Sequence, residues 1–236
     1  MRTLVVGDVH LRIGQVKQIL DRFSNVDRRV FVGDFFDDFE DSVERTLEMA
    51  EYARDVIAAD ANTRILFGNH DIQYAFPFME GLLCSGWAPG KAFALKDPAF
   101  QPLWERFEPY AWVDQFLVTH AGVHRSFIEG YENSVEDRLR ELWQEAMGSL
   151  GERRVLPLLS AGPTRGGSGK AGGITWLDWN REFEPVGGLS QMVGHTPDER
   201  VRLKEDKANK SANWNVDTYL RQVVVVEDGE VMVHAI

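Results

Sequence analysis

Short apolar runs alternate with stretches of helical spacing over the first third of the chain. Three runs, Thr3–Val6, Arg29–Val32 and Arg64–Phe67, each lead into a glycine, which is typical of buried strands. Between them, Gln15–Phe23 and Asp41–Ala59 carry apolar residues at three- and four-residue spacing, which predicts two helices. Strands that alternate with helices indicate a parallel sheet, and sites in such sheets lie at the carboxyl ends of the strands.

The rest of the chain has a less regular pattern. Phe76–Val113 is rich in aromatic residues and proline, so we expect irregular helices and loops that cover one side of a site. Val135–Met147 has the spacing of an amphipathic helix, and the glycine-rich Ala161–Gly173 predicts a mobile loop. Further strands, mostly antiparallel in the C-terminal part, are predicted at Gln115–Thr119, Gln191–Val193, Val201–Lys204, Asn213–Asp217, Gln222–Val226 and Val231–His234.

Length and charge narrow the class of protein. The chain has 236 residues, of which 44% are hydrophobic, and we expect a single domain over residues 1–236. Its formal net charge of −11 would repel a polyphosphate backbone, which disfavours a long nucleic acid as a partner. Part of this charge lies between residues 34 and 44. There the first carboxylates are candidates for a cation site and the later ones open a helix.

Neither a disulfide framework nor a membrane anchor is predicted. The single cysteine, Cys84, lies among apolar residues and is interpreted as a buried structural thiol. Charge interrupts the N-terminal segment too soon for a signal peptide, and no apolar run has the length of a membrane span. We therefore expect a cytoplasmic protein that does not contact membranes, and the sequence leaves its oligomeric state open.

Five short motifs place polar side chains in a fixed order along the chain. They are GDVH at Gly7–His10, GDFFDD at Gly33–Asp38, GNHD at Gly68–Asp71, THAG at Thr119–Gly122 and GHT at Gly194–Thr196. Each follows an apolar run, and carboxylate, amide and imidazole groups are ligands of divalent metals such as Mn²⁺, Fe²⁺ and Zn²⁺. Four of the six histidines fall inside these motifs, which favours a metal site over scattered structural histidines.

The order of these motifs resembles that of the calcineurin-like metallophosphoesterase superfamily. The closest likeness is to its phosphoprotein phosphatase branch and the bacterial and phage relatives of that branch. The resemblance implies a four-layer α/β/β/α sandwich, in which two mixed β-sheets pack face to face and helices flank them. It also implies a hydrolase that uses two divalent metal ions per chain, which we expect to be Mn²⁺, with Fe or Zn as alternatives.

Residue by residue, the resemblance implies roles for eight side chains. Six would ligate the metals: Asp8, His10 and Asp34 the first ion, and Asp34, Asn69, His120 and His195 the second. Asp34 would bridge the two ions, and a hydroxide between them would attack phosphorus in line. His70 would be the general acid that protonates the leaving oxygen, and Asp37 would orient His70.

The chain departs from the family pattern where the family binds the substrate phosphate. An arginine in the second motif is replaced by Asp38, and the glycine after it by Phe39. Another cation must therefore meet the phosphate, and Arg165 and Arg181 are the candidates by their place in the chain. Gly166–Gly173 contains GGSGKAGG, but it lacks the first glycine and the hydroxyl residue of a P-loop, so we expect a flexible lid there.

Two other family glycines are replaced by larger residues, Leu11 after the first motif and Tyr219 near the C-terminus. The segment Trp176–Asp178 resembles the Trp-Ser-Asp of the family. Asp178 is equally well explained as a loop residue and as a neighbour of the site.

Several phosphoesters are possible substrates. The first expectation is a phosphomonoesterase similar to the serine/threonine phosphoprotein phosphatases. A bis(5'-nucleosyl)-tetraphosphatase is the alternative, because that bacterial group shares His-Ala-Gly in the fourth motif, and a nucleotide phosphodiesterase comes third. The expected partner is thus a phosphorylated substrate, either a phosphoprotein or a nucleotide. A metal-stabilised binding module would instead load metal without hydrolysing any phosphoester.

Overall fold

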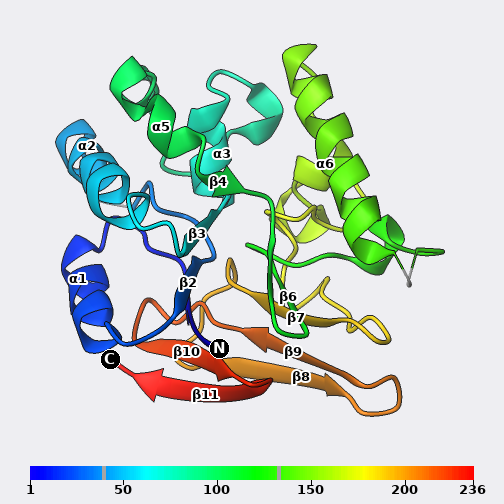
Figure 1. Ribbon diagram of the computed structural model, residues 1–236. Coiled ribbons are helices and arrows are strands. Elements are labelled where there is room, and N and C mark those ends of the chain that lie inside the picture. Colours follow the sequence, from blue (N-terminus) through cyan, green and yellow to red (C-terminus); the bar gives the residue numbers. More distant parts are fainter. Residues whose placement is uncertain (39–40, 132–133) are drawn as a thin grey trace.

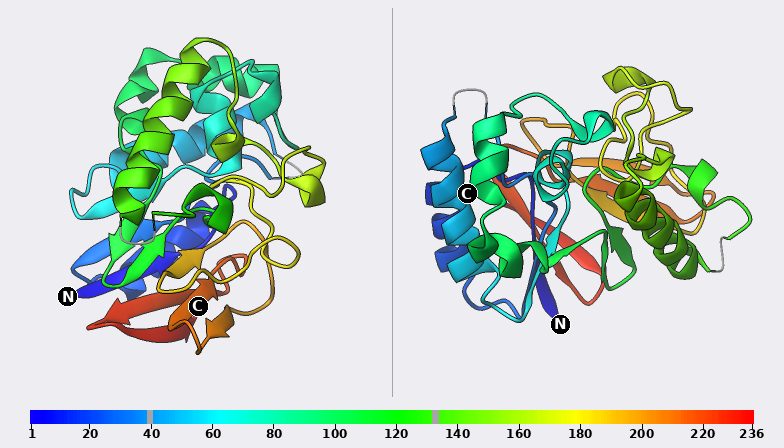
Figure 2. Two further views of the ribbon diagram at one scale, coloured as in Figure 1. Left: turned by 90° about the vertical axis from the view of Figure 1, so that its right-hand side faces the viewer. Right: turned by 90° about the horizontal axis from the view of Figure 1, so that it is seen from above.

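Two β-sheets packed face to face form the centre of the protein, as seen in a computed structural model that describes residues 1–38, 41–131 and 134–236 (Figures 1 and 2). The first sheet has the strand order β11-β10-β1-β2-β3-β4, and the second has the order β5-β6-β7-β9-β8. Each sheet contains both parallel and antiparallel pairs. The predicted class, two mixed sheets flanked by helices, is confirmed.

Apolar strands of the N-terminal third form the parallel centre of the first sheet: β1 (Arg2–Val6), β2 (Arg28–Phe31) and β3 (Thr63–Leu66). The short strand β4 (Phe107–Glu108) pairs parallel with β3. At the other edge, β10 (Gln222–Glu227) and β11 (Glu230–Ala235) form the predicted hairpin, and β10 pairs antiparallel with β1. Except for β4, these strands were expected from the sequence, to within two residues at each end.

Helices α1 (Ile13–Arg22) and α2 (Val43–Tyr52) cover the outer face of the first sheet (Figure 1). The Ser42 side chain caps α2 by accepting a hydrogen bond from the Arg45 N–H, which explains where that helix begins. A π-helical turn at Ala53–Ile57 extends α2, so most of the predicted helix over Asp41–Ala59 is present. Phe39 and Glu40 lie outside the described residues.

The segment expected to be irregular consists of short helices and turns. It follows α3 (Asn69–Ala75) and contains α4 (Pro89–Leu95), α5 (Gln101–Trp104), the 3₁₀ turns Glu80–Leu82 and Pro98–Phe100, and strands β4 and β5 (Ala111–Val113). Proline stands in the first turn of both α4 and α5, where its missing N–H costs nothing. Several residues between positions 81 and 86 line the cavity described below, so this segment does cover one side of it.

The second sheet is mixed, as predicted. Its further strands are β6 (Phe116–Val118), β7 (Ser190–Val193), β8 (Arg202–Asp206) and β9 (Ser211–Asn215). β8 and β9 form an antiparallel pair, but β7 runs parallel to both β6 and β9. The two parallel pairs both involve β7, because a long connection that contains α6 (Val135–Gly151) links it to β6, and long crossovers permit parallel pairing.

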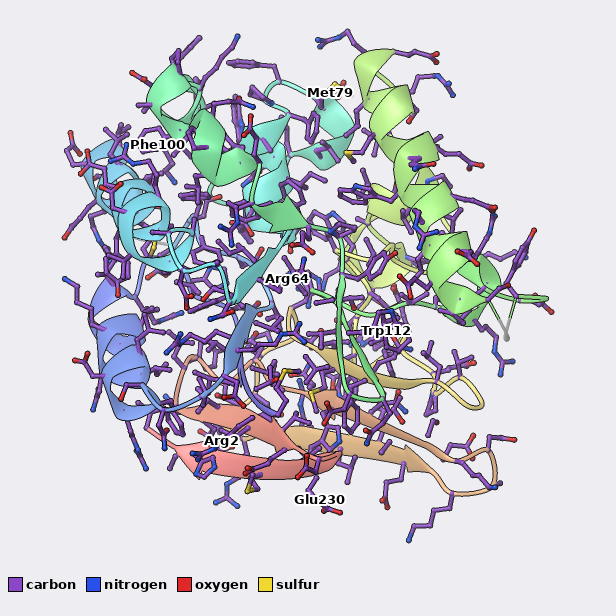
Figure 3. All side chains as sticks on the ribbon, in the orientation of Figure 1. Arg2, Arg64, Met79, Phe100, Trp112 and Glu230 are labelled. Carbon is purple, nitrogen blue, oxygen red and sulfur yellow. The ribbon has the colours of Figure 1, made fainter. Side chains whose placement is uncertain are left out.

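Valine residues fill the space between the sheets. Val5, Val30 and Val224 of the first sheet pack in one buried cluster with residues of the second sheet such as Val118 and Met192. Side chains occupy the space between the sheets and beneath the helices (Figure 3). Among the described residues, no helix is long and apolar enough to cross a membrane.

Candidate metal centre and active-site cavity

The five motifs meet at one edge of the two sheets, because each follows the carboxyl end of a strand. Asp8 follows β1, Asp34 follows β2, Asn69 follows β3, His120 follows β6 and His195 follows β7. A cavity of about 790 Å³ opens over them, and its lining includes seven predicted site residues: His10, Asp34, Asp37, Asn69, His70, Arg165 and His195. Asp8 and His120 are buried beneath these residues.

His120 is the centre of the first cluster of donor atoms. Its Nε2 lies 3.1 Å from Asn69 Oδ1 and 3.2 Å from His195 Nδ1. The same atom lies 3.4 Å from Asp34 Oδ2. Two ligand atoms that each lie about 2.1 Å from one ion are roughly 3.0 Å apart when the angle at the ion is a right angle, and roughly 3.4 Å apart when it is tetrahedral. These four side chains therefore have the spacing of ligands around a common metal ion.

A backbone contact fixes the tautomer of His120. His120 Nδ1 lies 2.9 Å from the Val32 carbonyl oxygen, which can only accept, so Nδ1 must carry the hydrogen. In the neutral ring Nε2 is then a lone pair that faces two acceptor oxygens, Asn69 Oδ1 and Asp34 Oδ2. Such a backbone contact is the usual way in which a protein fixes the tautomer of a metal-binding histidine.

A second cluster shares Asp34 with the first. Asp34 Oδ1 accepts a hydrogen bond of 2.9 Å from the His70 N–H, which leaves Oδ2 for the metal site. His10 Nε2 lies 3.7 Å from that Oδ2 and 4.0 Å from Asp8 Oδ2. His10 Nδ1 donates to the Asp37 carbonyl oxygen at 2.8 Å, so Nε2 again faces the carboxylates. Asp34 Oδ2 thus lies between two groups of potential ligands.

The buried carboxylates of the site also favour a bound cation. Burial, followed by the nearby Asp217, raises the pKa of Asp8 well above its usual range. Burial opposes ionisation of Asp34 too, but His120, His70 and His10 outweigh it and lower the pKa of Asp34. Burial would lower the pKa of His120, but Asp34 and Asp8 raise it to about 9. Without a metal, the buried carboxylates therefore favour a protonated His120, and a bound ion would displace that proton.

Tight packing and an unusual backbone hold the ligands in place. His10, Asp34, Asp37 and His195 all have positive φ angles, between 43° and 69°. Residues other than glycine rarely adopt this conformation, and where they do, the surrounding structure imposes it, often at functional sites. Gly68 is required for a different reason: a Cβ there would lie only 2.5 Å from the Asp34 main-chain nitrogen.

His70 and Asp37 lie beside the candidate metal ligands. His70 Nδ1 is 3.1 Å from Asp37 Oδ2. Burial would lower the pKa of His70, but Asp34 and then the hydrogen bond to Asp37 raise it well above its usual value. Asp37 is itself held by Gln73 Nε2 at 2.5 Å, the Tyr74 hydroxyl at 2.6 Å and Lys91 Nζ at 2.7 Å.

Two supporting residues were not found from the sequence. Asp71 accepts hydrogen bonds from the N–H groups of Gly68, Asp34 and Phe35 at 2.7–2.9 Å, and it thereby connects two loops of the candidate metal site. Lys91 is buried against Asp37 and also contacts Asp41 at 2.6 Å. The signal for Asp71 was its place in the third motif, whereas Lys91 comes from the irregular segment and carries no local signal.

Cys84 lies elsewhere than predicted. It is half-buried rather than buried, it lines the cavity, and its Sγ is 3.6 Å from His70 Nδ1. Its N–H donates to Gln73 Oε1 at 2.9 Å, which brings the chain back toward α3 after the turn at Glu80–Leu82. This tertiary contact, which the sequence pattern does not reveal, places the thiol beside the site.

The two predicted phosphate-binding arginines differ in position. Arg165 lines the cavity and its Nη2 lies 3.2 Å from Asp178 Oδ2. Arg181 is absent from the described lining, and its main-chain N–H donates to Asp178 Oδ1 at 3.0 Å. Asp178 therefore neighbours the site through Arg165. The glycine-rich loop around Arg165 is anchored because the N–H groups of Thr164 and Gly172 both donate to Glu182. Its predicted mobility stays a prediction.

A family model described as calcineurin-like phosphoesterase matches residues 1–199, a range that contains all five motifs. The chain belongs to the calcineurin-like phosphoesterase family. It is accordingly a metal-dependent phosphoesterase, a hydrolase of a family that binds divalent metals, and the two ligand clusters that share Asp34 are its candidate metal site.

Solved structures with the same fold include several phosphatases. A cold-active protein-tyrosine phosphatase of a psychrophilic Shewanella is 15% identical with a TM-score of 0.58, covering 99% of this chain and 77% of that one. A putative diadenosine tetraphosphatase is 16% identical with a TM-score of 0.52, covering 99% and 93%. A protein serine/threonine phosphatase from Saccharomyces cerevisiae is 12% identical with a TM-score of 0.52, covering 99% and 79%. At sequence identities of 12–16%, the similarity shows a shared fold only. No curated protein matches the sequence.

Proposed function

We propose that this phosphoesterase hydrolyses phosphomonoesters, in the manner of a serine/threonine phosphoprotein phosphatase, with two divalent metal ions. The observation that carries the proposal is the position of His70. Its main-chain N–H binds the shared ligand Asp34 at 2.9 Å, and its ring is held by Asp37 at 3.1 Å. A histidine fixed in this way beside a metal site is suited to general acid catalysis.

The donor set fits two divalent ions. One ion would be held by Asp8, His10 and Asp34, and the other by Asp34, Asn69, His120 and His195. When bound, the ions would supply Lewis acidity for the phosphoryl oxygens and a water molecule of lowered pKa as nucleophile. Oxygen and imidazole donors accept Mn²⁺, Fe²⁺ and Zn²⁺ alike, and we propose Mn²⁺ as the working metal.

The protein's own side chains would handle the proton. Asp37 engages His70 Nδ1, so the Nε2 hydrogen of the ring is available for the leaving oxygen. Burial opposes the charged imidazole, but Asp34 and Asp37 favour it, so His70 is proposed to carry the proton before the ester bond breaks. Tyr74 and Lys91 fix the orientation of the Asp37 carboxylate, and the imidazole is thereby positioned as well.

A second candidate is hydrolysis of a dinucleoside tetraphosphate. Aromatic side chains of Trp176 and Tyr219 line the cavity, and such rings can stack on nucleobases. A putative diadenosine tetraphosphatase shares the fold. Turnover of a phosphothreonine peptide and of diadenosine tetraphosphate by the same Mn²⁺-loaded protein distinguishes the two candidates. The phosphatase proposal requires faster release of phosphate from the peptide.

His70→Ala tests the mechanism. We expect the variant to bind two Mn²⁺ ions and to lose about 10²–10⁴-fold in turnover of the phosphothreonine peptide. The loss should be much smaller for p-nitrophenyl phosphate, because nitrophenolate leaves without needing a proton. His124→Ala, which changes a histidine outside the cavity lining, is the matched control and should retain activity. Equal losses on both substrates would remove the general acid role from His70.

A further inference from the structure

Arg12 lines the cavity and has no carboxylate partner within residues 1–38, 41–131 and 134–236. Among the described residues, the arginine and lysine side chains that line the cavity are Arg12 and Arg165. Arg165 is paired with Asp178, but the buried Nη1 of Arg12 has no hydrogen-bond partner in the part of the chain that the structure describes. An unpaired buried guanidinium nitrogen carries a desolvation penalty, which an anion bound in the cavity would offset.

The helix that follows does not explain Arg12. Arg12 is the N-cap residue of α1, a position where Ser, Thr, Asp or Asn would accept hydrogen bonds from the free N–H groups. A guanidinium group has no acceptor atom, and its positive charge is disfavoured at the positive end of the helix dipole. No capping hydrogen bond is made by its side chain. Stability of α1 would therefore favour another residue at this position.

Tyr219 holds the arginine over the cavity. The Arg12 guanidinium carbon lies 5.7 Å from the centroid of the Tyr219 ring, within the range of a cation–π contact. Tyr219 and Leu220 both have positive φ angles, 56° and 58°, and Gln15 of α1 donates to the Tyr219 carbonyl oxygen at 3.4 Å. This turn therefore brings an aromatic ring from the far end of the chain against the start of α1.

We propose that Arg12, positioned by Tyr219, binds the phosphoryl group of the substrate. Arg12 lies two residues after His10, a proposed metal ligand, so its side chain starts from the same loop as the metal site. A planar guanidinium group matches two phosphate oxygens at once. The second motif has Asp38 where a cation would be needed, and Arg12 supplies that cation from the neighbouring loop. This inference rests on the proposed function, since it assigns a residue of the same site.

Inorganic phosphate, the product of hydrolysis, is the probe. Calorimetry on the Mn²⁺-loaded protein would compare the wild type with Arg12→Met, Arg12→Lys and Tyr219→Ala. We expect Arg12→Met to weaken phosphate binding by about 10- to 100-fold, the effect of losing a hydrogen-bonded charged group. Arg12→Lys should recover part of the affinity, because it restores the charge without the second donor. Tyr219→Ala should give a smaller loss, and Tyr219→Phe should restore wild-type binding.

Arg221→Met is the matched control. The Arg221 guanidinium carbon also lies 5.7 Å from the Tyr219 ring, but Arg221 is not part of the described cavity lining, so phosphate binding should not change. Mn²⁺ affinity of Arg12→Met should equal that of the wild type and its unfolding temperature should be no lower, which separates phosphate binding from folding and metal loading.

Three results would overturn the inference: wild-type phosphate affinity in Arg12→Met, loss of Mn²⁺ binding in that variant, or no phosphate binding by the wild type. A larger loss in Arg165→Met, with Arg12→Met unaffected, would assign the role to Arg165. Failure of the proposed function gives a different result. In that case phosphate binding would depend on Arg12 while the wild type hydrolysed no phosphoester.

Discussion

Gly68→Ala should remove the metal site by adding a single methyl group. The new Cβ would lie 2.5 Å from the Asp34 main-chain nitrogen and 2.8 Å from Asp34 Cγ. The φ of Gly68 is −93°, so the backbone conformation itself would suit alanine and the effect is steric.

The size of the effect follows from these distances. To reach the 3.4 Å of ordinary van der Waals contact, one of the two backbones must move by about 0.9 Å. Metal sites tolerate deviations of about 0.2 Å in ligand distances. Asp34 is proposed to bridge both ions, so a displacement several times larger than that tolerance should impair both sites. Overpacking of this kind also costs about 1–3 kcal/mol of folding free energy.

Calorimetric titration of chelator-stripped protein with Mn²⁺, together with thermal unfolding, checks this prediction. Gly148→Ala is the matched control, because a Cβ at that position in α6 meets nothing within 4 Å. It should bind Mn²⁺ normally and gain roughly 0.5–1 kcal/mol in stability from the helix propensity of alanine. Two Mn²⁺ ions bound by Gly68→Ala with wild-type affinity would refute the reasoning about Asp34.

Two further predictions concern protons and hydrogen bonds. Since Asp34 and Asp8 outweigh burial and raise the pKa of His120 to about 9, an incoming ion must displace a proton below that pH. Mn²⁺ affinity should then fall about tenfold per pH unit as the pH is lowered from 8 to 6, with close to one proton released per chain from this histidine. Titrations in buffers of different ionisation enthalpy measure the release, and a pH-independent affinity would contradict it. The two carboxylate oxygens of Asp71 accept hydrogen bonds from three main-chain N–H groups. Asp71→Asn replaces one of these oxygens by a donor, so the free energy of unfolding measured with denaturant should fall by about 1–3 kcal/mol. An unchanged free energy of unfolding would show that these bonds contribute little.

The sequence was most informative where the signal is local. An apolar run followed by glycine and a polar side chain defines a strand and its end together, so β1, β2 and β3 and the residues after them were predicted closely. The chemical nature of those residues then indicated metal ligands. Parallel pairing brings strand ends to the same edge of a sheet, which explains why the motifs meet.

Such local patterns did not predict the contacts between segments that are distant in the sequence. Lys91 reaches Asp37 across 54 positions of sequence, and nothing around it distinguishes it from a surface lysine. Arg12 was overlooked because its environment depends on Tyr219, which is more than 200 residues away. The parallel direction of β7 depends on the crossover through α6, whereas its apolar pattern suits either direction. Local periodicity does not encode these tertiary relations.

The most direct test of the proposed two-metal site is a joint titration. Chelator-stripped protein would be titrated with Mn²⁺ while bound Mn²⁺ and hydrolysis of p-nitrophenyl phosphate are measured on the same samples. We predict two ions per chain, hydrolysis that rises with their binding and disappears on chelation, and neither binding nor hydrolysis in Asp34→Ala. Full hydrolysis by the stripped protein, or two bound ions in Asp34→Ala, would contradict the assignment of Asp34 to a shared metal site.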